Sequence, residues 1–137
     1  MGKIDFLKER AKEFWENALD LFQKERYNLC AFRLEQSFKL WLKYLIGKRL
    51  GNRPQIHYLV ELIKELSKTY DSSEILEYLK ENELFLDDLS DAYFVSRYYP
   101  KRFSKSLTEK LIKECEKFIK LTEKITKKSF LTYENIG

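Results

Sequence analysis

The stretch YNLCAFRLEQSFKLWLKYLIGKRL, residues 27–50, predicts one long helix that is apolar around most of its circumference. Its main apolar face consists of Cys30, Ala31, Leu34, Phe38, Trp41 and Leu45. Its polar remainder is a strip in which Glu35, Lys39 and Lys43 are spaced by four residues, with Arg33 and Gln36 beside them. A helix of this kind lies inside a helical bundle or at a subunit interface.

Apolar residues at three- and four-residue spacing continue on both sides of this stretch, and no run alternates with period two. Further helices are expected at about 5–24, 56–68, 75–97 (where a break can occur at 81–82) and 106–128. Short connections between helices favour antiparallel neighbours. The sequence therefore predicts an all-α fold, an up-and-down four-helix bundle with one additional short helix.

Short sequence motifs predict where two of the helices begin. His57 is expected in the first turn of the third helix, and Ser106 to Glu109 fits a capping box at the start of the last one. With 137 residues, the chain is expected to form a single domain over 1–137. Its core would span about 5–128, and the tail 129–137 would either dock or fray.

Composition excludes several classes of protein. The net charge of +4 is too weak to indicate nucleic-acid binding by itself. The two cysteines, Cys30 and Cys115, lie in apolar settings and are expected to be buried thiols. With only one histidine and no CxxC or HExxH, neither a metal site nor a cofactor is expected. No signal-peptide region and no apolar run near 18 residues occurs, so we expect a cytoplasmic protein without membrane contact.

The run SRYYPKRF, residues 96–103, is the second informative stretch. Pro100 should end the fourth helix near residues 96–98, which places Arg97 at a helix C-terminus. Arg97, Arg102, Tyr98 and Tyr99 could together hold a phosphate and a base. The alternative is a solvated helix end whose arginine only caps carbonyl groups.

The order of these features resembles the HEPN domain, the nucleotide-binding domain of higher eukaryotes and prokaryotes. Ala31, Gln36 and Lys43 match the Ala-x4-Gln-x6-Lys pattern of its second helix. His57 matches its His-x-Leu helix start, and RYYP at 97–100 matches its Arg-Tyr-Pro signature with one inserted residue. The resemblance covers about residues 5–128. It implies a helical bundle that is usually a homodimer, often paired with a small nucleotidyltransferase in toxin–antitoxin or defence systems.

One branch of that family consists of metal-independent RNases that use an arginine followed by four to six residues and then by a histidine. After Arg97 those positions hold Arg102, Phe103 and Ser104, so the histidine is missing. Histidine suits proton transfer because its pKa lies near neutrality, whereas an arginine cannot give up its proton. We therefore predict no catalytic residue and do not transfer the RNase activity.

Three functional hypotheses follow. The first is a non-catalytic nucleotide- or RNA-binding module, with phosphate at Arg97 and Arg102, and a base stacked on Tyr98 or Tyr99. The residues expected to assist are Lys43, Arg53, His57 and Lys101. The second is a dimeric adaptor, or a partner of a nucleotidyltransferase, that uses the apolar surface of the first two helices. The third, least favoured, is a nuclease using Arg97 with His57 or a tyrosine.

Overall fold

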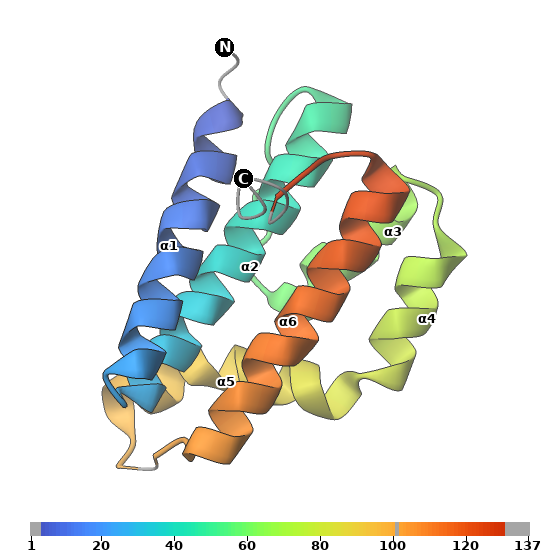
Figure 1. Cartoon of the computed structure of the whole chain (residues 1–137). Helices are drawn as coiled ribbons and strands as arrows, with labels where there is room; N and C mark the ends of the chain where they lie inside the picture. Colours follow the sequence, from blue (N-terminus) through green and yellow to red (C-terminus); the bar gives the residue numbers. More distant parts are fainter. Residues whose placement is uncertain (1–3, 101, 131–137) are drawn as a thin grey trace.

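The computed structural model describes residues 4–100 and 102–130, and of Tyr93 and Ser96 only the backbone. This part of the chain contains six α-helices and no strand, which confirms the predicted all-α fold (Figure 1). The helices are α1 (Asp5–Gln23), α2 (Tyr27–Leu50), α3 (Leu59–Thr69), α4 (Ser73–Glu81), α5 (Glu83–Tyr98) and α6 (Lys105–Thr126). None of them is long and apolar enough to cross a membrane.

Helix α2 lies at the centre and packs against α1, α3, α5 and α6. Its predicted bounds, 27–50, are confirmed. Its buried side chains surround most of the helix axis, as the apolar pattern indicated. Phe38, Trp41 and Leu42 are almost fully buried, and full burial of such a side chain stabilises the fold by roughly 1.5–3 kcal/mol. The Ser37 hydroxyl donates to the Ala11 carbonyl at 2.7 Å and so ties α2 to α1.

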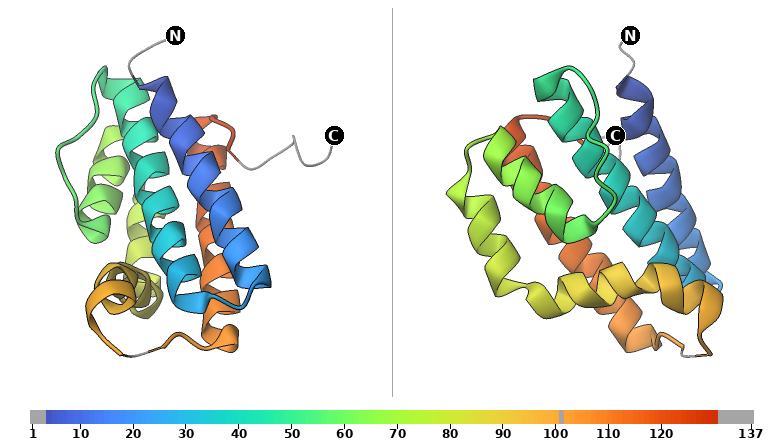
Figure 2. Two further views of the ribbon diagram at one scale, coloured as in Figure 1. Left: turned by 90° about the vertical axis from the view of Figure 1, so that its left-hand side faces the viewer. Right: turned by 180° about the vertical axis from the view of Figure 1, so that it is seen from behind.

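The connection from α2 to α3 is an extended segment, residues 51–58, that returns along α2 (Figure 2). Gly51 permits the reversal because it adopts a left-handed conformation, with φ of 95°. His57 thereby comes to lie beside Lys39, whereas Tyr70, just after α3, donates to the Leu45 carbonyl. Helix α3 therefore runs parallel to α2, which departs from a strict up-and-down order.

The position predicted for His57 was wrong. Helix α3 begins at Leu59, so His57 lies in the extended segment before it and not in its first turn. Pro54 disfavours a helical backbone at the residue before it. Ile56 packs against the core from a non-helical backbone, and this contact holds the segment in its extended form. His57 therefore presents its backbone carbonyl to α2, which a residue within the helix could not do.

The break predicted at 81–82 is confirmed and separates α4 from α5. The Ser72 hydroxyl caps α4 by accepting from the Ile75 N–H. After the break, α5 crosses the lower part of α2 and also contacts α6 (Figures 1 and 2). It ends at Tyr98, followed by Tyr99 in extended geometry, so Arg97 lies in its last turn as predicted.

Helix α6 begins at Lys105, and its cap is Ser104, whose hydroxyl accepts from the Leu107 N–H at 3.0 Å. The capping box predicted from Ser106 was therefore placed two residues too late. Of the predicted tail, Phe130 is fully buried and stacks on Trp41, with ring centroids 4.6 Å apart. Residues 131–137 lie outside the described part of the chain.

Both cysteines are buried free thiols, as predicted. Burial raises the pKa of the Cys30 thiol to about 12. It also raises the pKa of Cys115. Thiols of this kind remain protonated and behave as small apolar side chains.

Candidate functional site

The polar strip of α2 forms one wall of a cleft of about 590 Å³. The segment before α3 and the middle of α5 form the other walls. A cleft of this volume is within the range that small-molecule ligands occupy. The side chains that line it are those of Glu35, Gln36, Lys39, Leu40, Lys43, His57, Tyr58, Leu59, Val60, Ser90, Asp91 and Phe94.

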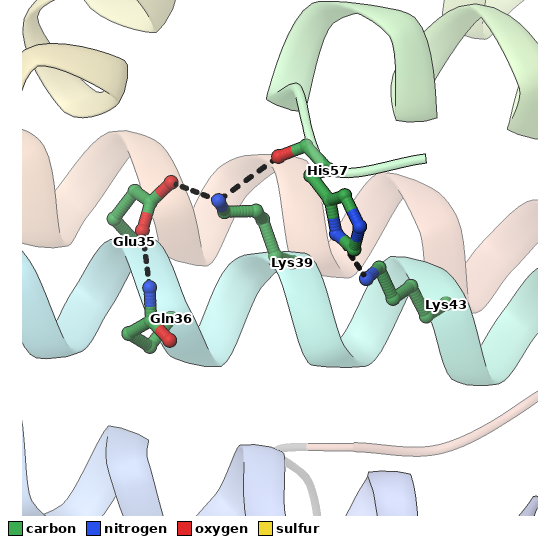
Figure 3. Close-up of polar contacts among 5 residues, drawn as sticks. All are labelled: Glu35, Gln36, Lys39, Lys43 and His57. Carbon is green, nitrogen blue, oxygen red and sulfur yellow. Dashed lines mark hydrogen bonds and ion pairs between the residues drawn. The ribbon is translucent and has the colours of Figure 1, made fainter. Parts of the chain in front are cut away.

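Lys39 joins two walls of the cleft. Its Nζ lies 2.9 Å from Oε2 of Glu35, one turn earlier on α2, and donates to the His57 carbonyl, also at 2.9 Å (Figure 3). Gln36 donates from Nε2 to the other oxygen of Glu35 at 2.8 Å. The ammonium group of Lys39 thus holds the extended segment against α2 and fixes the position of His57.

Glu35 is buried, with 2% of its surface exposed, and is the acid that pairs with Lys39. Burial raises the pKa of its carboxyl group above the ordinary value, although Lys39 and Gln36 act in the opposite direction. Its negative charge is directed to Lys39 and Gln36, and the structure brings no acid within ion-pair distance of Lys43 in the described chain.

Lys43 extends toward the imidazole ring, with Nζ 3.4 Å from Nδ1 of His57 (Figure 3). A charged lysine has only donors, so Nδ1 can accept from Lys43 in the tautomer that carries the ring proton on Nε2. Burial lowers the pKa of Lys43, and the positive charges of Lys39 and Arg53 lower it further. Lys39 and Arg53 therefore lie close enough to repel the positive charge of Lys43.

The end of α5 forms a second cationic region. The Arg97 guanidinium lies over the Phe32 ring, 5.0 Å from its centroid, and Arg33 lies 5.5 Å from the same ring. Such cation–π contacts stabilise by about 0.5–1 kcal/mol at exposed sites. The side chains of Tyr98 and Tyr99 are 66% and 62% exposed.

Arg102 lies in a third place, a hollow of about 570 Å³ between the start of α2 and the loop after α5. Tyr99 and Pro100 line this hollow together with residues 25–29. The Phe103 N–H donates to the Asn28 side chain at 2.7 Å, which holds the loop against α2. Arg102 and Tyr99 thus share a hollow that does not include Arg97.

A comparison with protein-family models matches residues 4–125 to the HEPN domain. The chain belongs to the HEPN domain family. The match covers most of the chain and includes every helix at least in part. Comparisons with curated proteins and with solved structures gave no match.

Apart from Ala31, which is buried in the core, the HEPN signature residues lie along one side of α2. Gln36, Lys43 and His57 line the cleft, and Arg97 contacts Phe32, one turn before Gln36. Phe32 and Lys43 are separated by eleven residues, or about 16 Å along the helix axis. The structure therefore places Lys43, Arg53 and His57 together but separates them from Arg97, Tyr98, Tyr99 and Arg102.

Several residues of the cleft were not among the predicted site residues. Lys39 belongs to the four-residue spacing of Glu35, Lys39 and Lys43, and a polar strip on a mostly apolar helix was the signal that could have revealed it. Asp91 and Phe94 come from α5, and no sequence signal shows that α5 crosses α2 at this level. Lys101, predicted to assist, lies outside the described residues. In the described chain, no group of three or more His, Cys, Asp or Glu side chains could hold a metal ion.

Proposed function

We propose that this HEPN protein is a non-catalytic module that binds a nucleotide or RNA, with a phosphate at the Lys43 end of the cleft. The observation that carries the proposal is that Lys39, Lys43 and His57 line one cleft, that Arg53 lies close enough to act on the charge of Lys43, and that Glu35 is the acid paired with Lys39. A phosphate is the ligand that would relieve the repulsion among these cations. This proposal moves the phosphate from Arg97 and Arg102, where the sequence suggested it, to the residues expected only to assist.

Partial burial supports the choice of this end. Charges interact more strongly where protein replaces water, and Lys43 is half-buried whereas Arg102 is exposed. Lysine binds phosphate as a point charge, and the Nε2 hydrogen of His57 supplies a further donor. Arg97, with Tyr98, could then contact a neighbouring nucleotide when the ligand is RNA.

The absence of catalysis is part of the proposal. An RNase of this family needs an imidazole close to its arginine. Here His57 contacts Lys43, about 16 Å along α2 from the ring that Arg97 covers. Arg102 cannot accept a proton from a nucleophile. Incubation of the purified protein with labelled RNA should give no cleavage; cleavage lost in Arg97→Ala would contradict this part of the proposal.

Binding is tested by titrating the protein with nucleoside 5′-monophosphates and short RNA at low and high salt. We expect saturable binding that weakens with salt. Lys43→Gln should reduce affinity about tenfold or more, whereas Lys120→Gln, on the exposed face of α6, should leave it unchanged. No saturable binding, or equal losses in the two variants, would overturn the proposal.

A second candidate function is that of a dimeric adaptor or a nucleotidyltransferase partner in a toxin–antitoxin or defence system. It is favoured by large apolar side chains that α5 and its flanks expose: Leu84 is 82% exposed, Phe94 54% and Tyr98 66%. Family membership supports a homodimer. Light scattering at micromolar concentration tests it, and a strict monomer would count against the dimer.

The cytoplasmic location and the single domain over 1–137 stay predictions.

A further inference from the structure

The cleft that we propose for phosphate also contains an exposed carboxylate. Asp91 lines the cleft from α5. In the part of the chain that the structure describes, no cation forms an ion pair with Asp91. A carboxylate beside a phosphate would weaken its binding, so Asp91 must face a different part of the ligand.

The course of α5 places Asp91 away from Lys43. Arg97 contacts Phe32, so α5 crosses the first half of α2, near Glu35 and Gln36. Lys43 lies eight residues beyond Glu35, or about 12 Å further along the helix axis. The cleft therefore has a cationic end and a carboxylate end.

Apolar side chains also line the cleft. Leu40, Leu59 and Val60 line it, and Phe94 lies on α5 one turn after Asp91, with half of its surface exposed. A flat ring could pack against Phe94, because aromatic faces bind the faces of bases. A ligand that fits the whole cleft has an anion at one end, a flat ring between, and hydrogen-bond donors at the other end.

We propose that the Asp91 end of the cleft selects guanine, so that the ligand is a guanine nucleotide or a guanine residue of RNA. The Asp91 carboxylate would accept from N1–H and from the 2-amino group, two adjacent donors that match its two oxygens. The Ser90 hydroxyl, which also lines the cleft, would donate to O6. This inference rests on the proposed function, because the phosphate anchors the ligand at Lys43.

The other bases do not present the same edge. Adenine and cytosine place a ring acceptor beside their amino group, and uracil flanks its single N–H with two carbonyl groups. Each would bring an acceptor against the carboxylate and leave a desolvated group unpaired. Hypoxanthine retains N1–H but lacks the 2-amino group, so it isolates one of the two proposed hydrogen bonds.

The test is isothermal titration calorimetry of the full chain with the 5′-monophosphates of guanosine, inosine, xanthosine, adenosine, cytidine and uridine. Each compound carries the same phosphate group, and they differ only in the base. We expect guanosine monophosphate to bind about tenfold more tightly than the adenosine, cytidine and uridine compounds, and inosine monophosphate to be intermediate. Asp91→Asn should abolish the preference for guanosine. It should also strengthen binding of xanthosine monophosphate, because the new amide donates to its 2-oxo group.

The control is Asp87→Asn, an exposed acid one turn earlier on α5 and outside the cleft. It should keep the preference for guanosine. The gain for xanthosine monophosphate cannot come from misfolding. Equal affinity for all six compounds, or equal effects of the two substitutions, would overturn the guanine inference and leave the phosphate site intact. If none of the six compounds binds, both proposals are overturned.

Discussion

The two cationic regions of this protein differ in how deeply their charges lie. At the cleft, Lys39 and Lys43 are half-buried and contact the backbone and ring of His57, and only Lys39 is paired with an acid, Glu35. At the end of α5, Arg97 and Arg102 are exposed and lie in separate places. The sequence run around Arg97 was the more conspicuous of the two. Burial and convergence, which the sequence does not display, are the reasons why we propose the phosphate site at the cleft.

Charge reversal should distinguish the two regions most clearly. Lys43→Glu places a carboxylate among the groups proposed to hold phosphate, and we expect nucleotide affinity to fall by about 100-fold or more. Arg102→Glu, in the hollow at the other end of α2, should reduce affinity by less than about threefold at moderate salt, because exposed charges are screened. Titration calorimetry measures both. A larger loss in Arg102→Glu would reverse the ranking of the two regions.

The pH dependence of binding should identify Lys43. Its pKa is lowered by burial and by neighbouring cations, so it loses its proton at a lower pH than an ordinary lysine. Affinity for phosphate should therefore decrease as the pH rises toward the ordinary lysine value of about 10.4. The Lys43→Arg variant should retain its affinity over that range, because arginine stays protonated. Identical pH profiles would show that Lys43 does not carry the effect.

Glu35→Gln should strengthen phosphate binding several-fold, because it removes the negative charge that is paired with Lys39. The raised pKa of Glu35 means that folding favours its protonated form, so the charged form costs stability at neutral pH. The variant should therefore unfold within about 1 kcal/mol of the parent, or be more stable. Any advantage should shrink as the pH falls through the raised pKa. Urea unfolding at several pH values tests this, and a large loss at neutral pH would contradict it.

Arg97→Ala should have the smallest effect. Loss of its contact with the Phe32 ring should lower the free energy of unfolding by about 0.5–1 kcal/mol. Mononucleotide affinity should change little, because Arg97 does not line the cleft. Paired urea unfolding and titration experiments measure the two quantities. A tenfold loss of mononucleotide affinity would return the phosphate site to the end of α5.

Periodicity and turn chemistry predicted the helices well. The bounds of α2 and the end of α5 followed from apolar spacing and from Pro100, which act within a few residues. The extended return of residues 51–58 was missed, because it depends on how Ile56 packs against distant helices. This segment brings His57 to Lys39 and Lys43 and so completes the cleft.

The membership of the site was harder to predict than the fold. Lys43, Arg53 and His57 were predicted to assist a phosphate at Arg97 and Arg102, but the structure places Lys43 beside His57 and close to Arg53, apart from Arg97. Asp91 and Phe94 reach the cleft because α5 crosses α2, and a crossing angle leaves no trace in the spacing of residues on one helix. Tertiary arrangement therefore decides which charged side chains form a site.

The most direct test maps the ligand onto the chain by NMR. Amide resonances of the labelled protein are followed during titration with guanosine monophosphate. The account predicts saturable shifts at Lys39, Lys43 and His57 on one side and at Asp91 on the other, with little change at Arg102. Shifts confined to residues around Arg97 and Arg102, or none at saturating ligand, would contradict it.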